Sequence, residues 1–146
     1  SPCLYSHAPI DLVVLSLGGN DLKAYYKRSA ADVRDGLNSL VNIIQSSHYG
    51  YNLQQAPKIL IVSQSIPLPI SEPFTDDEGI VVFERAIERA QQLIELYAQL
   101  AKETGCYFLK ASSDIKPSTI DGIHLDEAGH TTLATLIKDK INHIYS

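Results

Sequence analysis

Apolar residues follow two spacings along this chain: three short, nearly uninterrupted runs, and three longer stretches in which they recur every third or fourth position. The short runs lie at 11–17, 58–63 and 106–109, and each leads into glycine, proline or polar residues. A short continuous apolar run is typical of a strand that is buried on both faces, as in a parallel sheet covered by helices. We therefore predict three buried strands at these positions.

The longer stretches have the spacing of amphipathic helices. The first runs from Val33 to Ile44, the second from Phe83 to Ala101 and the third from Leu133 to Ile144. Ser29 and Asp32 have the spacing of a capping box, which predicts where the first helix begins. Gly105 suits a left-handed C-terminal position and predicts where the second helix ends.

Strands and helices thus alternate along the chain. This order predicts a single α/β domain over residues 1–146, a three-layer α/β/α fold with a parallel sheet. In open sheets of this kind, functional sites lie beyond the carboxyl ends of the strands. Three loops meet this condition, those that follow Leu17, Ser65 and Leu109.

The loop after the second predicted strand is long and unusual in composition. Residues 66–79 include three prolines and four acidic residues, so this segment cannot continue a central strand. We interpret it as a functional or mobile loop. Its apolar part, 68–74, has two candidate roles: one wall of an acyl or aryl pocket, or a surface for contact between subunits. A homo-oligomer is therefore left open.

Composition limits the classes of binding partner and the cellular location that we expect. The formal net charge of the 146-residue chain is −5 and no basic stripe is present, which argues against nucleic acid as a partner. The longest apolar run, 12–17, is too short to span a membrane. Cys3 and Cys106 are too few for a disulfide framework, and there is no Cys-x-x-Cys pair. We therefore expect a reducing, cytoplasmic location and no metal site.

The first candidate site follows the first predicted strand, at Gly18-Gly19-Asn20-Asp21. Two glycines suit a tight turn with close backbone approach. Asn20 then presents a neutral amide donor, which can stabilise an oxyanion as its charge develops. The alternative is a plain turn, since glycine and asparagine favour turns in any case.

The second candidate site is Asp121-Gly122-Ile123-His124, after the third predicted strand. A carboxylate three residues before a histidine can accept the Nδ1 proton of the imidazole and leave Nε2 free to act as a base. The alternative is that Asp121 or Asp126 caps the last helix and that the histidine is incidental.

Together and in this order, the two motifs resemble blocks of the SGNH hydrolases, also called GDSL-like lipases or esterases. Gly18-Gly19-Asn20-Asp21 matches the family's Gly-x-Asn-Asp block, and Asp121-Gly122-Ile123-His124 matches its Asp-x-x-His block. The resemblance implies the flavodoxin-like fold of that family and a small-molecule ester substrate, without a metal or an organic cofactor. The segment from Pro9 to Lys23 is most similar to bacterial arylesterase and acyltransferase members.

The resemblance also assigns roles. It implies that Asn20 donates its amide to the oxyanion, with Gly18 and Gly19 forming the turn that aims it. His124 is implied as general base and then general acid, and Asp121 as the residue that orients His124. The implied reaction is serine-dependent hydrolysis of short acyl or aryl esters. The alternatives are a carbohydrate O-deacetylase on the same site and a non-catalytic binding or scaffold protein.

Two blocks of the family pattern are not found in the sequence. The Gly-Asp-Ser block, which carries the nucleophile, and the block that supplies a glycine N–H to the oxyanion both precede the Gly-x-Asn-Asp block in the family. No glycine precedes Gly18 in this sequence. We therefore expect that the nucleophilic serine and one or more N-terminal strands belong to a segment absent from this chain, and that the 146 residues alone are inactive.

Overall fold

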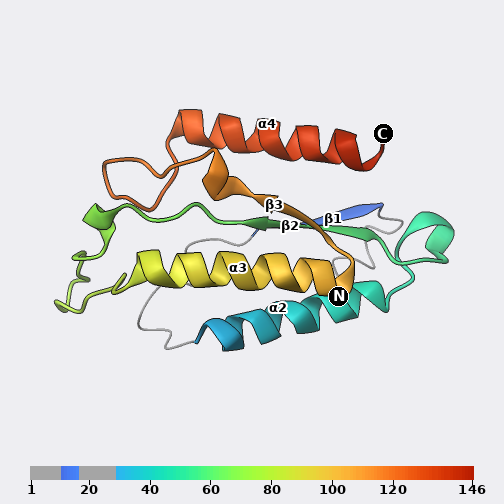
Figure 1. Cartoon of the computed structure of the whole chain (residues 1–146), viewed down its shortest axis with the longest axis horizontal. Coiled ribbons are helices and arrows are strands. Elements are labelled where there is room, and N and C mark those ends of the chain that lie inside the picture. Colours follow the sequence, from blue (N-terminus) through green and yellow to red (C-terminus); the bar gives the residue numbers. More distant parts are fainter. Residues whose placement is uncertain (1–10, 17–28) are drawn as a thin grey trace.

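A computed structural model describes residues 11–16 and 29–146 of the chain. It contains a three-stranded parallel sheet in the order β1-β2-β3 (Figure 1). Leu12 of β1 is in register with Lys58 of β2, and Leu60 of β2 is in register with Tyr107 of β3. The strands are β1 (Leu12–Ser16), β2 (Lys58–Ser63) and β3 (Tyr107–Lys110).

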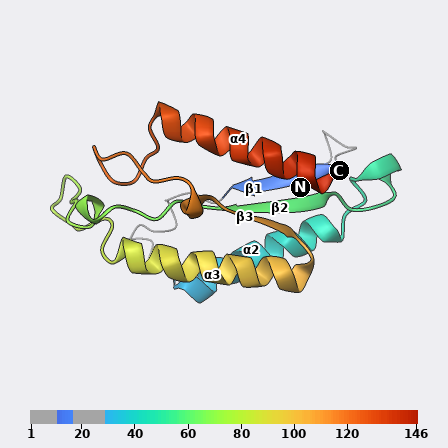
Figure 2. The same ribbon diagram turned by 45° about the horizontal axis from the view of Figure 1, so that its top comes forward.

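Three long helices cover the sheet. Two of them lie on one face and the third lies on the other, as two views of the ribbon show (Figures 1 and 2). The predicted three-layer α/β/α fold with a parallel sheet is confirmed. None of the helices in the described part of the chain is long and apolar enough to cross a membrane. The helices are α2 (Ala30–Gln45) and α3 (Ala86–Thr104) on the first face and α4 (Glu127–Ile144) on the second.

The predicted helix ends agree with the structure where local chemistry specifies them. The backbone N–H of Asp32 donates to Ser29 Oγ at 3.0 Å, and the N–H of Ser29 donates to Asp32 Oδ2 at 3.3 Å. This is the predicted capping box at the start of α2. Gly105 ends α3 in the left-handed conformation, with φ 71°.

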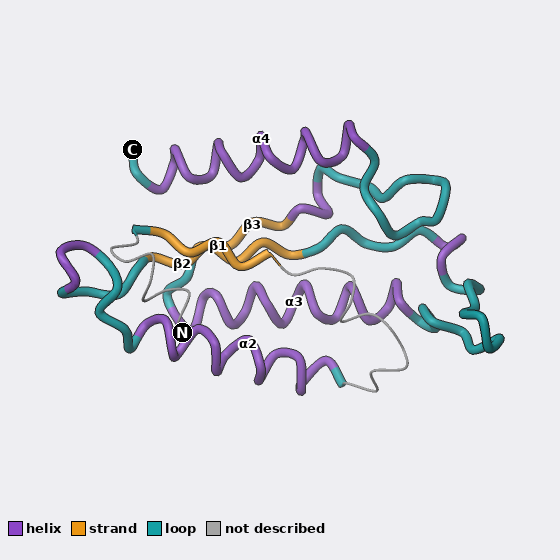
Figure 3. Tube along the Cα trace, turned by 180° about the vertical axis from the view of Figure 1, so that it is seen from behind, coloured by secondary structure: helices purple, strands orange, loops and turns teal. Residues whose placement is uncertain are grey.

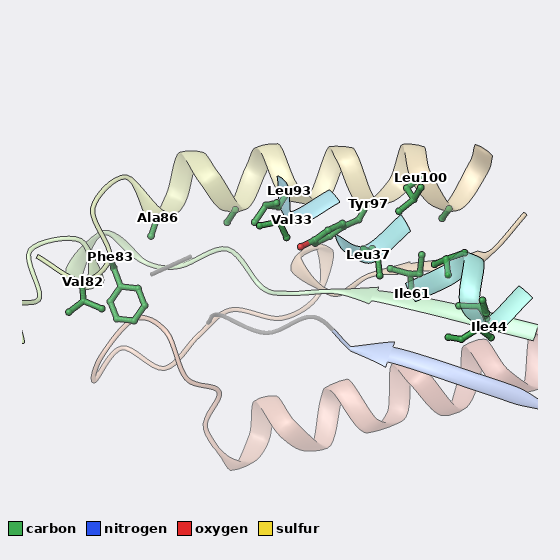
Figure 4. Close-up of a cluster of buried hydrophobic side chains, with 14 residues drawn as sticks. Val33, Leu37, Ile44, Ile61, Val82, Phe83, Ala86, Leu93, Tyr97 and Leu100 are labelled. Carbon is green, nitrogen blue, oxygen red and sulfur yellow. The ribbon is translucent and has the colours of Figure 1, made fainter. Parts of the chain in front are cut away.

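The start of α3 was predicted too early. The apolar stripe starts at Phe83, whereas the helix begins at Ala86 because the preceding Arg85 has a left-handed backbone, with φ 56°. Phe83 is nevertheless buried in the same cluster as the helix residues (Figure 4). A residue outside the helix can therefore continue its stripe.

The main core lies between the sheet and the pair α2 and α3 (Figure 4). Val41 of α2, Ile61 of β2 and Tyr97 of α3 are each 0% exposed there. A smaller cluster lies on the other face, where Leu60 and Val62 of β2 pack against partly buried apolar residues of α4. Successive side chains of β2 thus point to opposite faces of the sheet and contribute to both hydrophobic clusters.

Residues 59–63 of β2 are fully buried, but the two strands beside β2 are not. Val14 of β1 is 37% exposed, and the other residues of β1 and β3 are at most half-buried. Within the described residues, β1 pairs only with β2, and α4 has no fully buried residue. The prediction of burial on both faces was therefore wrong for β1 and β3, because each has a neighbour on one side only in the described sheet.

Candidate active site

The candidate site lies at the carboxyl edge of the sheet. Since the strands are parallel, the loops that follow β2 and β3 leave from the same edge, and they lie at the same end of the molecule (Figures 1 and 3). The loop that follows β1 carries Gly18, Gly19 and Asn20, and these residues lie outside the part of the chain that the structure describes. The described part of the site therefore comes from two of the three predicted loops.

Asp121 and His124 contact each other in the loop between β3 and α4. The distance from His124 Nδ1 to Asp121 Oδ2 is 2.6 Å, a short hydrogen bond to a carboxylate. The imidazole side chain is 82% exposed and the carboxylate 42%. The pair is therefore formed within the loop itself and faces solvent.

The second carboxylate oxygen of Asp121 holds the backbone of the turn. Asp121 Oδ1 accepts the N–H of Ile123 at 2.9 Å and the N–H of His124 at 3.0 Å. The Ile123 hydrogen bond and then the His124 side chain lower the pKa of Asp121 from 3.8 to about 2. The lowered pKa therefore keeps the Asp121 carboxylate ionised at neutral and mildly acidic pH.

Helix capping does not account for Asp121. The N-terminal cap of α4 is Asp126, whose Oδ1 accepts the N–H of Gly129 at 2.7 Å. Asp121 instead uses both oxygens inside its own turn. The sequence left open that Asp121 or Asp126 caps the last helix. In the structure Asp126 is the cap, and Asp121 is not.

The hydrogen bond to Asp121 determines what the imidazole can do. With the proton on Nδ1, donated to the ionised carboxylate, Nε2 has a free lone pair. Among the described residues, Asp121 is the one side chain that forms a hydrogen bond with the ring. The arrangement suits an imidazole that accepts a proton from an incoming hydroxyl group.

Gly122 is a site residue that the sequence reasoning missed. It lies between Asp121 and His124 with φ 73°, its N–H donates to Ser118 O at 2.8 Å, and its carbonyl accepts the N–H of Leu68 at 2.9 Å. A glycine inside the Asp-x-x-His motif was the available signal.

Other candidate chemistry is not supported by the described residues. His130 is exposed in the first turns of α4 and has no ligand-like neighbours. In residues 11–16 and 29–146, no three histidine, cysteine or acidic side chains are arranged so that they could hold a metal ion. Burial raises the pKa of the Cys106 thiol, so this cysteine is a poor nucleophile.

The structure defines an α/β protein with a parallel sheet and an imidazole that a carboxylate orients at the carboxyl edge of that sheet. The sequence profile of the GDSL-like lipase/acylhydrolase family matches residues 3–132. The chain belongs to this family. A search of curated proteins found no match.

Solved structures agree with this assignment. The aryl esterase of M. smegmatis is 30% identical, with a TM-score of 0.82 over 97% of this chain and 65% of its own. A carbohydrate acetylesterase from Sinorhizobium meliloti is 32% identical, with a TM-score of 0.83 over 98% of this chain and 65% of its own. The lipase/acylhydrolase from Enterococcus faecalis, at 17% identity and a TM-score of 0.64, shares the fold over 90% of this chain and 60% of its own. This chain thus spans less than two thirds of the length of these proteins.

Proposed function

We propose that the protein hydrolyses carboxylic esters with short acyl or aryl groups through an acyl-enzyme. One observation carries the proposal: the ionised carboxylate of Asp121 holds the imidazole of His124 at the carboxyl edge of the sheet. This pair supplies the base that a serine hydroxyl needs, because serine is a weak nucleophile without one. Membership of a family of lipases and acylhydrolases supports the same chemistry.

The proposed reaction has two halves. In the first, a serine hydroxyl attacks the ester carbonyl carbon while His124 Nε2 takes the hydroxyl proton. The side-chain amide of Asn20 stabilises the oxyanion, and the tetrahedral intermediate collapses as His124 returns the proton to the leaving alcohol. In the second half, water attacks the acyl-serine with His124 again as base, which releases the acid and restores the serine.

We also propose that the serine belongs to a segment outside these 146 residues. Two described serines at the end of β2 and in the loop after it have other contacts: Ser63 Oγ donates to Leu109 O at 3.5 Å, and Ser71 Oγ donates to Leu68 O at 2.8 Å. The part-exposed β1, which pairs only with β2 in the described sheet, offers an edge for a further strand. A parallel strand added there would end at the same edge as the loop that carries His124.

The turn beside Gly122 supports an apolar acyl or aryl group. Leu68 and Ile70 pack against Gly122, and Ile70 is still 55% exposed. An apolar wall favours short acyl or aryl esters over acetylated sugars, whose hydroxyl groups need polar partners. A carbohydrate acetylesterase at 32% identity makes sugar deacetylation the second candidate. The ratio of kcat/KM for phenyl acetate and for an acetylated sugar separates the two.

The proposed function is tested with the full-length natural protein. We expect hydrolysis of p-nitrophenyl acetate and covalent labelling by a fluorophosphonate, with the adduct on a serine outside residues 1–146. An adduct within these residues would leave the hydrolase proposal standing and contradict the proposed source of the serine. A protein that shows neither hydrolysis nor labelling would be a binding or scaffold protein with the same fold.

The role of Asn20 has its own test. We expect Asn20→Ala to lower kcat for p-nitrophenyl acetate by roughly 10²- to 10³-fold, because one oxyanion donor is lost. Asn42→Ala, on the exposed side of α2, is the matched control and should leave kcat unchanged. A loss smaller than about threefold for Asn20→Ala would make Asn20 a turn residue without a catalytic role.

A further inference from the structure

A short turn after β2 contacts the turn that carries Asp121 and His124. The N–H of Leu68 donates to the carbonyl oxygen of Gly122 at 2.9 Å. Among the described residues, this is the one backbone hydrogen bond that joins the segment 118–124 to another part of the chain. The contact therefore links the loop after β2 to the Asp121–His124 pair.

The two turns also pack unusually closely. A Cβ atom on Gly122 would lie 2.7 Å from Ile70 Cγ2, and 3.2 Å from both Cβ and the carbonyl oxygen of Leu68. These are shorter than ordinary contacts, so Gly122 is needed for space as well as for its φ of 73°. A shift of either turn must therefore move the other.

The turn at Leu68–Ser71 is itself firmly held. Both the hydroxyl and the N–H of Ser71 donate to Leu68 O, at 2.8 and 3.0 Å, and Ser71 is buried. Pro69 restricts the backbone at the next position. Beyond the turn, Glu72 Oε1 accepts the N–H of Ile87 in the first turn of α3 at 3.4 Å. The Leu68–Ser71 turn is therefore a rigid support.

We propose that the Leu68–Ser71 turn is a positioning element, which acts through Gly122 to set the orientation of the Asp121–His124 pair. The inference rests on the proposed function, in which His124 must meet both a serine hydroxyl and the leaving alcohol. A displacement of about 1 Å can cost on the order of 10²-fold in rate, so a support that fixes this turn matters to catalysis. Leu68 and Ile70 are positioning residues, since they act through Gly122.

A double-mutant cycle between Gly122 and Ile70 tests the inference in the full-length protein. We expect Gly122→Ala to lower kcat about tenfold, with KM changed by less than about twofold. Ile70→Ala alone should lower kcat by about twofold, because it removes part of the support, and should raise KM, because Ile70 belongs to the proposed apolar wall. In the Gly122→Ala background the same change should instead raise kcat by about fivefold, because it removes the nearest clashing atom.

Gly79→Ala is the matched control for strain. Gly79 also has a positive φ, of 79°, but nothing lies within 4 Å of an added Cβ. The Gly79→Ala variant should lower the melting temperature about as much as the φ strain in Gly122→Ala does, and it should leave kcat unchanged. Adding Ile70→Ala to Gly79→Ala should not raise kcat. Equal losses of kcat in the two glycine variants, or no rescue by Ile70→Ala, would overturn the positioning role.

A second readout does not depend on activity. The proton between His124 Nδ1 and Asp121 Oδ2 can be followed by NMR in protein with ¹⁵N-labelled histidine. Its low-field resonance should weaken in Gly122→Ala, return with Ile70→Ala and persist in Gly79→Ala. This pattern in a protein without esterase activity would support the positioning element and overturn the proposed function. An unchanged resonance in an active protein would overturn the positioning element alone.

Ser71→Ala covers the case in which Gly122→Ala does not fold. It removes the hydroxyl bond to Leu68 O without adding an atom, and we expect kcat to fall about threefold with a weakened resonance. Ser39→Ala, which removes a similar side-chain bond to Asp35 O on α2, is its control and should change neither readout. An unchanged resonance and kcat in Ser71→Ala would contradict the proposal.

Discussion

His124→Ala should remove nearly all hydrolysis of p-nitrophenyl acetate by the full-length protein, with kcat lower by at least about 10⁴-fold. The serine then has no base, and the leaving alcohol has no acid. The loss should be catalytic, because Asp121 Oδ1 still accepts the backbone N–H groups of Ile123 and residue 124 in the variant. Steady-state kinetics give the loss, and thermal unfolding should show a melting temperature close to that of the parent.

His130→Ala is the control for this experiment. His130 is exposed on α4, six residues beyond His124. The described hydrogen bonds and ion pairs of the Asp121 and His124 side chains do not involve it. The control should retain full activity. A fully active His124→Ala variant would contradict the assignment of His124 as the base. Loss of activity in His130→Ala instead of His124→Ala would contradict it as well.

Asp121→Asn should lower kcat by about 10³- to 10⁴-fold with little change in structure. The carbonyl oxygen of the new amide can keep the two backbone hydrogen bonds, which leaves its NH₂ group facing His124 Nδ1. An NH₂ group cannot accept a proton, so the imidazole must take the tautomer with its proton on Nε2. Nε2 can then no longer accept the proton of the serine.

Asp126→Asn makes the same chemical change five residues away and controls for it. Asn caps helices about as well as Asp, so the cap at Gly129 N should survive and kcat should stay unchanged. Both acylation and deacylation use the imidazole as a base. Single-turnover kinetics of Asp121→Asn should therefore show that the rates of both steps are lower. An Asp121→Asn protein within about threefold of the parent would show that the pair is structural.

The arrangement of the elements was largely predictable from the sequence. The capping box at Ser29 and Asp32 and the left-handed Gly105 depend on neighbouring residues alone, and both were predicted correctly. The start of α3 was not predicted correctly. The left-handed backbone of Arg85 makes Ala86 the first helical residue, although the apolar stripe of the helix begins earlier, at the buried Phe83. Periodicity reports which residues are buried and not where the helical backbone begins.

The exposure of β1 shows a second kind of limit. Its apolar run resembles that of β2, and both were predicted to be buried on both faces. Burial depends on the number of strands and helices around a run, which the run itself does not encode. In the described sheet β2 is central and β1 is not, so two similar apolar runs differ in exposure.

For the candidate site, too, the sequence predicted the local contact and the tertiary structure decided the contact between distant loops. The contact between Asp121 and His124 was within reach of the sequence, because three residues separate them and the turn forms by its own hydrogen bonds. The support at Leu68 and Ile70 was decided by tertiary structure alone. It depends on two loops that leave the same edge of a parallel sheet and pack against each other, and no local spacing records which atoms of distant loops will meet.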